Sequence, residues 1–246
     1  MSEPQQTLTI QQALDLAVQH HTAGRLSEAE TIYQQILQSD PNQVDALHLL
    51  GVISHQAGKN DVAVDLITKA LSLKPDLAEA HSNLGNALRD LGKQEDAVTS
   101  YRKALGIKPD LAEAHNNLGT VLQALGKVEE AVASYRKALS LKPDYADAHN
   151  NLGNALKDLG KPEEAVASYR KAFGLKPDYA LAHSNLGNAL RDLGKLDEAV
   201  ACYRKALRLK PEFAEAHYNL GNALKDLGKI DEAVASYHKA LALKPD

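Results

Sequence analysis

The sequence predicts an all-α fold, an α-solenoid superhelix built from repeated helix–turn–helix units. Two observations carry this prediction. The segment Asn-Leu-Gly and several small residues recur at fixed places along the chain. Prolines recur every 34 residues, at Pro41, Pro75, Pro109, Pro143, Pro177, Pro211 and Pro245. Self-similarity with a period of this length is typical of a solenoid, in which each unit buries its apolar face against its neighbours.

Composition limits the class of protein. The chain has 246 residues, of which 44% are hydrophobic and 24% charged, as expected of a folded globular protein. A net charge of −4 argues against a nucleic-acid-binding protein. The single cysteine, Cys202, excludes an internal disulfide. Met1–Thr9 lacks signal-peptide features, and no apolar run approaches the roughly 20 residues that span a bilayer. We therefore expect a cytoplasmic protein that does not insert into membranes.

The repeats follow one another without interruption. With the recurring proline at position 32 of each unit, a polar lead (residues 1–9) precedes one solenoid (residues 10–246). The seven predicted repeats are 10–43, 44–77, 78–111, 112–145, 146–179, 180–213 and 214–246. The first two are less regular, because Ala17 replaces glycine at position 8 and Ile67 replaces tyrosine at position 24.

Two helices are predicted in each repeat, and the third repeat illustrates both. Gly92 follows the first helix, as expected at a helix C-terminus, and Pro109 stops the second. Apolar residues recur at helical spacing in the first helix, at Ala80, Leu84, Ala87, Leu88 and Leu91, and in the second, at Ala97, Val98, Tyr101, Ala104 and Leu105. Glycine at position 8 costs helix stability, so its recurrence predicts a contact that a methyl group would block.

Pairs of polar residues three apart precede the first helices. Such pairs are typical of capping boxes, in which a side chain at the helix start accepts a bond from the backbone. The predicted pairs are Thr9 with Gln12, Asp76 with Glu79, Asp110 with Glu113, and Asp144 with Asp147.

This pattern resembles the tetratricopeptide repeat. The 34-residue unit has Leu-Gly at positions 7 and 8, Ala at 20, Tyr at 24, Ala at 27 and Pro at 32. The resemblance implies a right-handed superhelix whose first helices line a concave side. Closer similarity, in the Asn-Leu-Gly-Asn-Ala-Leu segments, is to the repeat region of protein O-linked N-acetylglucosamine transferases. In that family the concave asparagines engage the substrate chain.

One face of the first helices carries the candidate binding residues. Positions 2, 6, 9 and 13 share this face, and asparagine recurs mid-helix at positions 6 and 9 although it is a poor helix former. An asparagine amide both donates and accepts, so it can pair with a peptide backbone whatever the side chains. The asparagine face comprises Asn83, Asn86, Asn117, Asn151, Asn154, Asn185, Asn188, Asn219 and Asn222. Its predicted rim comprises Arg89, Asp90, Lys157, Asp158, Arg191, Asp192, Lys225 and Asp226. The alternative is that these amides bond neighbouring helices.

Histidine at position 4 and tyrosine at position 24 are interpreted as packing residues. Equivalent histidines of stacked repeats lie about one helix spacing, ~8–10 Å, apart, which is too far to share a metal ion. Position 24 lies among apolar positions, so we do not expect the tyrosines to stack on nucleic-acid bases. Cys202 is interpreted as a small buried hydrophobe without a base partner.

Catalysis needs distinct groups in distinct roles, whereas this chain repeats the same residues. We therefore predict a protein that is not an enzyme, has no cofactor or metal, and binds proteins or extended peptides. Two alternatives remain. The chain is the substrate-recognition region of a larger O-GlcNAc transferase-like enzyme, or it self-associates as a homo-oligomer through terminal helices that lack a polar cap.

Overall fold

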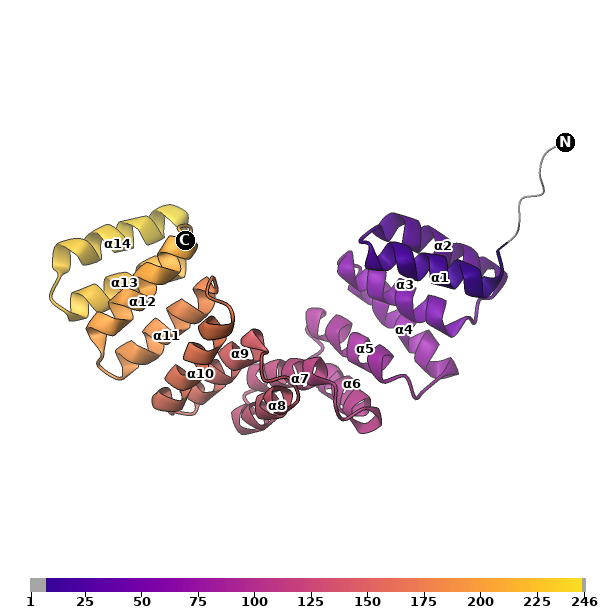
Figure 1. The fold of residues 1–246 in the computed structure, drawn as a ribbon, viewed down its shortest axis with the longest axis horizontal. Coiled ribbons are helices and arrows are strands. Elements are labelled where there is room, and N and C mark those ends of the chain that lie inside the picture. Colours follow the sequence, from indigo (N-terminus) through magenta and orange to yellow (C-terminus); the bar gives the residue numbers. More distant parts are fainter. Residues whose placement is uncertain (1–7, 245–246) are drawn as a thin grey trace. The chain divides into compact units, whose positions relative to one another are not determined.

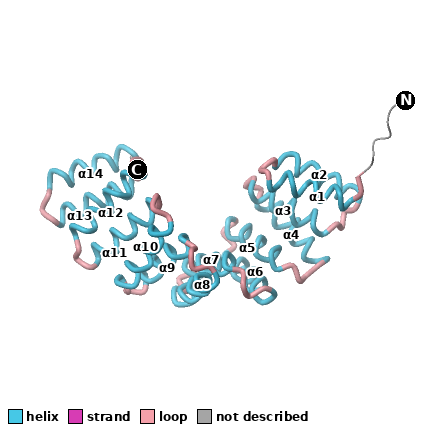
Figure 2. The backbone as a smooth tube through the Cα atoms, viewed as in Figure 1, coloured by secondary structure: helices cyan, strands magenta, loops and turns pink. Residues whose placement is uncertain are grey.

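The computed structural model describes residues 8–244, so most of the predicted polar lead and the last two residues lie outside this range. Within it, fourteen α-helices are joined by short loops and there is no β-strand (Figures 1 and 2). The chain divides into two compact units, Met1–Val121 and Leu122–Asp246, which are described separately.

Each predicted repeat contributes two helices of nearly constant length. In the first unit these are α1 (Ile10–Thr22), α2 (Leu26–Ser39), α3 (Val44–Gln56), α4 (Asn60–Leu73), α5 (Ala78–Asp90) and α6 (Gln94–Ile107). The unit boundary falls in α7 (Ala112–Ala124). The second unit contains α8 (Val128–Leu141), α9 (Ala146–Asp158), α10 (Pro162–Leu175), α11 (Ala180–Asp192), α12 (Leu196–Leu209), α13 (Ala214–Asp226) and α14 (Ile230–Leu243).

Helices pack as consecutive pairs within each unit. The two helices of a repeat make the most extensive contacts, as between α5 and α6 or between α13 and α14. The second helix of a repeat also packs on the first helix of the next, as α12 does on α13. These contacts confirm the predicted α-solenoid of helix–turn–helix repeats.

First helices of successive repeats also approach each other directly. In the second unit, α9 contacts α11 and α11 contacts α13 within 8 Å between Cα atoms, and α3 contacts α5 in the first unit. The second helices of these units approach one another less closely. In the second unit α9, α11 and α13 therefore lie on the tighter, inner side of the stack, as α3 and α5 do in the first, and the second helices are splayed apart.

The turn inside each repeat depends on glycine. Gly92 has a φ of 75°, in the left-handed region that other residues rarely adopt, and its amide bonds the carbonyl of Arg89. The equivalent glycine of every repeat has the same conformation. The predicted helix end at this position is confirmed.

Only one of the predicted capping boxes that can be checked is present. Thr9 accepts from the Gln12 backbone at 3.2 Å, and the Gln12 side chain accepts from the Thr9 amide at 2.9 Å. The predictions for Asp76 and Asp144 are wrong. The caps of α5 and α9 are the following residues, Leu77 and Tyr145, which make no side-chain cap bond. The aspartates lie one residue too early, in the turn after the proline.

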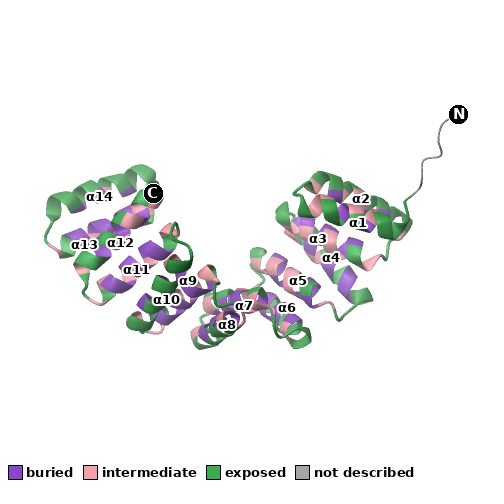
Figure 3. Ribbon diagram, in the orientation of Figure 1, coloured by how far each residue is buried: buried purple, intermediate pink, exposed green. Residues whose placement is uncertain are grey.

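The core of each repeat is a tyrosine packed against a glycine. Tyr101 is fully buried, and a Cβ added to Gly85 would lie 2.7 Å from the nearest atom of its ring. The same contact joins Gly153 to Tyr169 and Gly187 to Tyr203. Figure 3 shows the buried faces of the helices turned toward one another. The predictions of close approach at position 8 and of core tyrosines at position 24 are confirmed.

Candidate functional site

The asparagines at positions 6 and 9 all lie on the first helices and are all half-buried. In the second unit they occupy α9, α11 and α13, the helices that contact one another directly. The unit therefore brings Asn151, Asn154, Asn185, Asn188, Asn219 and Asn222 together on its inner side. Asn83, Asn86 and Asn117 lie on α5 and α7, in the chain that precedes the unit boundary.

Position-9 asparagines are held by the core tyrosines of their own repeats. The Tyr169 hydroxyl donates to Asn154 Oδ1 at 2.7 Å, and Tyr203 donates to Asn188 Oδ1 at the same distance. Tyr101 with Asn86 and Tyr237 with Asn222 repeat the bond. An amide whose oxygen is bound in the core directs its NH₂ group, with two donors, away from that oxygen. The tyrosines therefore orient a row of amide donors on the first helices.

Position-6 asparagines take part in bonds between neighbouring repeats. Asn185 Nδ2 donates to Asn150 Oδ1 of the preceding repeat at 3.0 Å. Asn117 donates to Asn86 at 3.0 Å, and Asn83 Nδ2 contacts His48 Nε2 at 3.0 Å. Asn219 makes no hydrogen bond among the residues described. Asn83, Asn117 and Asn185 therefore each bond a neighbouring repeat, as the structural alternative expects.

Position 5 carries a role that the sequence reasoning missed. Asn150 is only 1% exposed and supplies the oxygen that Asn185 binds. Ser184, at the same position in the next repeat, is equally buried. The signal was present, because position 5 is a small polar residue in four of the five regular repeats, at Ser82, Asn116, Asn150 and Ser184.

The predicted rim residues lie at the C-terminal ends of the first helices. Asp90 accepts from Arg89 at 2.9 Å and from His55 at 2.8 Å. Burial raises the pKa of the Asp90 carboxyl, but these two partners outweigh it and the net pKa is lowered. Asp158 accepts from Gln123 at 2.6 Å. Lys157 and Arg191 are half-buried, and Asp192, Lys225 and Asp226 are exposed. The rim thus mixes both charges.

Position-4 histidines bond the loop that precedes their helix. The Nε2 atom of His149 donates to the carbonyl of Pro143 at 3.0 Å, and His217 bonds Pro211 at 2.9 Å. His81, His115 and His183 bond the equivalent prolines. Burial, together with the charge of Lys171, lowers the pKa of His149, and burial with nearby cations does the same for His183. Among residues 8–244 no group of three or more potential ligands is placed to hold a metal.

Two further predictions concern Cys202 and the membrane. Cys202 is half-buried rather than fully buried, and burial raises the pKa of its thiol to about 11. The thiol is therefore protonated and unreactive at neutral pH. No helix in the described part of the chain has the length and apolarity needed to cross a bilayer.

Comparison with protein families agrees with the helix pairing. A model described as a TPR repeat matches residues 85–126, 122–160, 153–190 and 187–228. Models described as tetratricopeptide repeats match residues 20–84 and 214–246. A search of curated proteins gives no match.

The chain is also similar to several solved structures. The crystal structure of MamA is 30% identical with a TM-score of 0.61, and the match covers 66% of this chain and 95% of that one. That of YrrB, described as a TPR protein with an unusual peptide-binding site, is 28% identical with a TM-score of 0.61, over 73% and 93%. PilF of Pseudomonas aeruginosa, at 24% identity, shares the fold with a TM-score of 0.72, over 82% and 92%.

Proposed function

Because the chain belongs to the tetratricopeptide repeat family, we propose that it is a non-enzymatic interaction module that binds extended peptide segments along the asparagine face. YrrB, to which the chain is similar, is described as a TPR protein with an unusual peptide-binding site. The observation that carries the proposal is the bond from the core tyrosine to the position-9 asparagine in four repeats, which leaves the amide NH₂ group on the first-helix face.

The spacing of this face suits an extended backbone. Packed helices lie about 8–10 Å apart, and an extended chain rises about 3.3 Å per residue. One oriented amide is thus available for roughly every third peptide residue. Asn154, Asn188 and Asn222 donate to backbone carbonyls, while Asn219 offers both a donor and an acceptor. Because the contacts are to the backbone, the module selects extended conformation more than side-chain identity.

The test is binding to an unbiased library of extended peptides. The variant is Asn154→Asp, Asn188→Asp and Asn222→Asp combined, because aspartate keeps an oxygen for each tyrosine hydroxyl but has no amide donor. We expect wild type to bind peptides and the triple variant to lose most of that binding while keeping its helicity and melting temperature. Equal binding by the two proteins refutes the proposal.

A second candidate function follows from the recurring Asn-Leu-Gly-Asn-Ala-Leu segments. In this alternative the chain is the substrate-recognition region of a larger transferase that resembles the O-linked N-acetylglucosamine transferases. The same asparagine face then engages the protein substrate. The chain added in trans should compete with such a transferase for protein substrates, and lack of competition excludes this alternative.

Self-association is a third candidate, supported by the exposed face of α14. Val234 is 45% exposed, whereas Val98, Val132, Val166 and Val200 at the same position are all buried. Tyr218 and Leu241 are more than half exposed beside it. A mass that rises with concentration in light scattering, and that falls to the monomer in Leu241→Glu, supports this route. A constant monomer mass contradicts it.

A further inference from the structure

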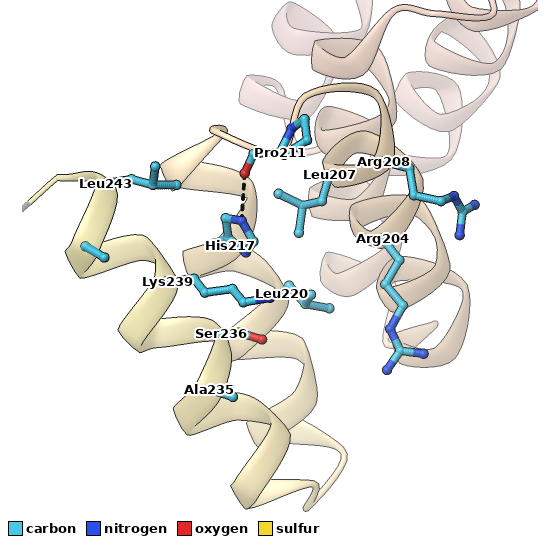
Figure 4. Close-up of a pocket in the computed structure, with 11 residues that line it drawn as sticks. Arg204, Leu207, Arg208, Pro211, His217, Leu220, Ala235, Ser236, Lys239 and Leu243 are labelled. Carbon is cyan, nitrogen blue, oxygen red and sulfur yellow. Dashed lines mark hydrogen bonds between the residues drawn. The ribbon is translucent and has the colours of Figure 1, made fainter.

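Two cavities with the same construction open on the second-helix side of the second unit. One has a volume of about 660 Å³ and lies between α12 and α14 above α13 (Figure 4). The other, of about 610 Å³, lies between α8 and α10 above α9. Both cavities form because the second helices are splayed apart. Neither contains a residue of the asparagine face.

The floor of each cavity is mainly apolar. Leu220 and Leu152 are buried at equivalent positions, and Leu207 and Leu139 line the neighbouring wall. The position-4 histidine also lines the floor, fixed by its bond to the proline carbonyl. The outer edges are open to solvent, since Leu243 and Leu175 are 40% and 45% exposed. Each cavity is thus a preformed open groove rather than an enclosed ligand site.

The charge on both grooves is positive. In the described part of the chain, no carboxylate lines either of them. Arg204 and Arg136 are paired with glutamates of the next second helix, Glu232 at 2.7 Å and Glu164 at 3.0 Å. Lys239 and Lys171 line the opposite walls, are exposed, and form no ion pair within residues 8–244. Figure 4 shows Lys239 extending toward Leu220 across the groove from Arg204 and Arg208.

The groove between α12 and α14 has one cation more than its counterpart. Arg208 is exposed and lines it, whereas Ser140 holds the equivalent position in the groove between α8 and α10. At the intervening place, between α10 and α12, the larger Phe173 replaces leucine and stacks on His183 with ring centroids 4.7 Å apart. At the equivalent place between the two open grooves, an aromatic ring therefore covers the histidine.

We propose that these two outer grooves bind acidic protein segments that insert an apolar side chain beside carboxylates. The apolar floor accepts the side chain, and Lys239 or Lys171 pairs with a carboxylate of the segment, with Arg208 adding a second pair in one groove. Charge complementarity selects an acidic partner over a basic one. This surface is independent of the asparagine face, so a chain can hold one partner on each side.

The experiment uses the full chain and a fluorescein-labelled peptide composed only of glutamate and leucine, followed by anisotropy. Matched peptides carry lysine for glutamate or serine for leucine. We expect the acidic leucine peptide to bind, binding to weaken as salt is raised, and both matched peptides to bind at least about tenfold more weakly. Absence of binding by the acidic leucine peptide, or equal binding by all three, overturns the proposal.

Charge reversals locate the site. Lys171→Glu combined with Lys239→Glu should weaken binding by about tenfold or more, and Arg208→Ser should weaken only the tighter of two sites. The matched control is Lys195→Glu combined with Lys229→Glu, the same charge change at exposed lysines that cap α12 and α14 and line neither groove. An equal loss in the control pair places the acidic peptide elsewhere and overturns the proposal. All these lysines lie on the surface, and circular dichroism verifies that each variant is folded.

Discussion

At the scale of single residues, position 8 requires glycine because of a close side-chain contact rather than because of its backbone conformation. A methyl group on Gly85 would lie 2.7–2.9 Å from three atoms of the Tyr101 ring. That ring is fully buried and its hydroxyl is bonded to Asn86, so it cannot move aside. The sequence predicted this contact from the recurrence of a residue that is costly inside a helix.

Gly85→Ala should therefore lower the free energy of unfolding by about 1–3 kcal/mol, the usual cost of overpacking a core. Gly106→Ala is the matched control, because that glycine also lies in a helix and a Cβ there meets nothing within 4 Å. The control should be neutral or stabilising by up to about 1 kcal/mol. Urea denaturation measures both, and equal effects would contradict the packing argument.

Position-24 tyrosines differ in what their hydroxyls bind. The Tyr203 hydroxyl donates to Asn188. The Tyr33 hydroxyl is buried and has no partner within residues 8–244, because position 9 of the first repeat is Val18. Tyr203→Phe should cost about 0.5–1.5 kcal/mol, and Tyr33→Phe should be neutral or stabilising. Thermal unfolding of the two variants measures both changes in stability. A larger loss in Tyr33→Phe would be inconsistent with the assigned bonds.

At the scale of helices and loops, the burial of the position-4 histidines His149 and His183 makes the stack sensitive to acid. His149 and His183 have lowered pKa values in the folded state because burial, aided by nearby cations, disfavours their charged forms. The unfolded chain takes up these protons near pH 6.5. Between pH 6.5 and the lower folded pKa values the unfolded state binds more protons, so stability falls as the pH falls.

The measurement is the free energy of unfolding between pH 7.5 and roughly pH 5. Wild type should lose stability below about pH 6.5, and the loss should be smaller in the double variant His149→Gln and His183→Gln. Glutamine keeps a donor for the proline carbonyls but does not titrate in this range. An identical pH dependence in both proteins would show that these histidines are not responsible.

Helix starts show where sequence reasoning was weakest. Thr9 and Gln12 form the predicted capping box, whereas Asp144 lies one residue before the true cap of α9. Spacing alone does not distinguish the cap position from the one before it, because the turn after the proline sets the register. Thr9→Ala should cost about 1 kcal/mol and Asp144→Ala close to nothing, as measured by thermal unfolding. The reverse order would contradict the assigned caps.

At the scale of the whole molecule, the repeat made the fold predictable, because a period of 34 residues specifies one helical hairpin many times over. The family and the packing roles of tyrosine, glycine and histidine followed from the same period. The site was only partly predictable. The sequence predicted that the asparagines share one face. It could not predict whether each amide bonds a tyrosine, a neighbouring repeat or a ligand, because that depends on distances between side chains in the folded structure.

The outer grooves could not be foreseen for a similar reason. Their residues come from three helices of two successive repeats, and the basic stripe on the second helices is also what a solvated helix face displays. What distinguishes the grooves is that, among the residues the structure describes, no carboxylate lines them, which is a three-dimensional property. The chain thus offers two surfaces of different chemistry, one of oriented amides and one of cations over apolar floors.

The central claim is that the asparagine face binds peptide backbone, and Asn219 tests it most directly. Asn219 makes no hydrogen bond within the described residues, so removing its amide leaves the stack intact. The measurement is the affinity of Asn219→Ala for a peptide selected by wild type, with the melting temperature recorded alongside. We predict a loss of about fivefold to tenfold, the worth of one hydrogen bond, at unchanged stability. Unchanged affinity would contradict the account.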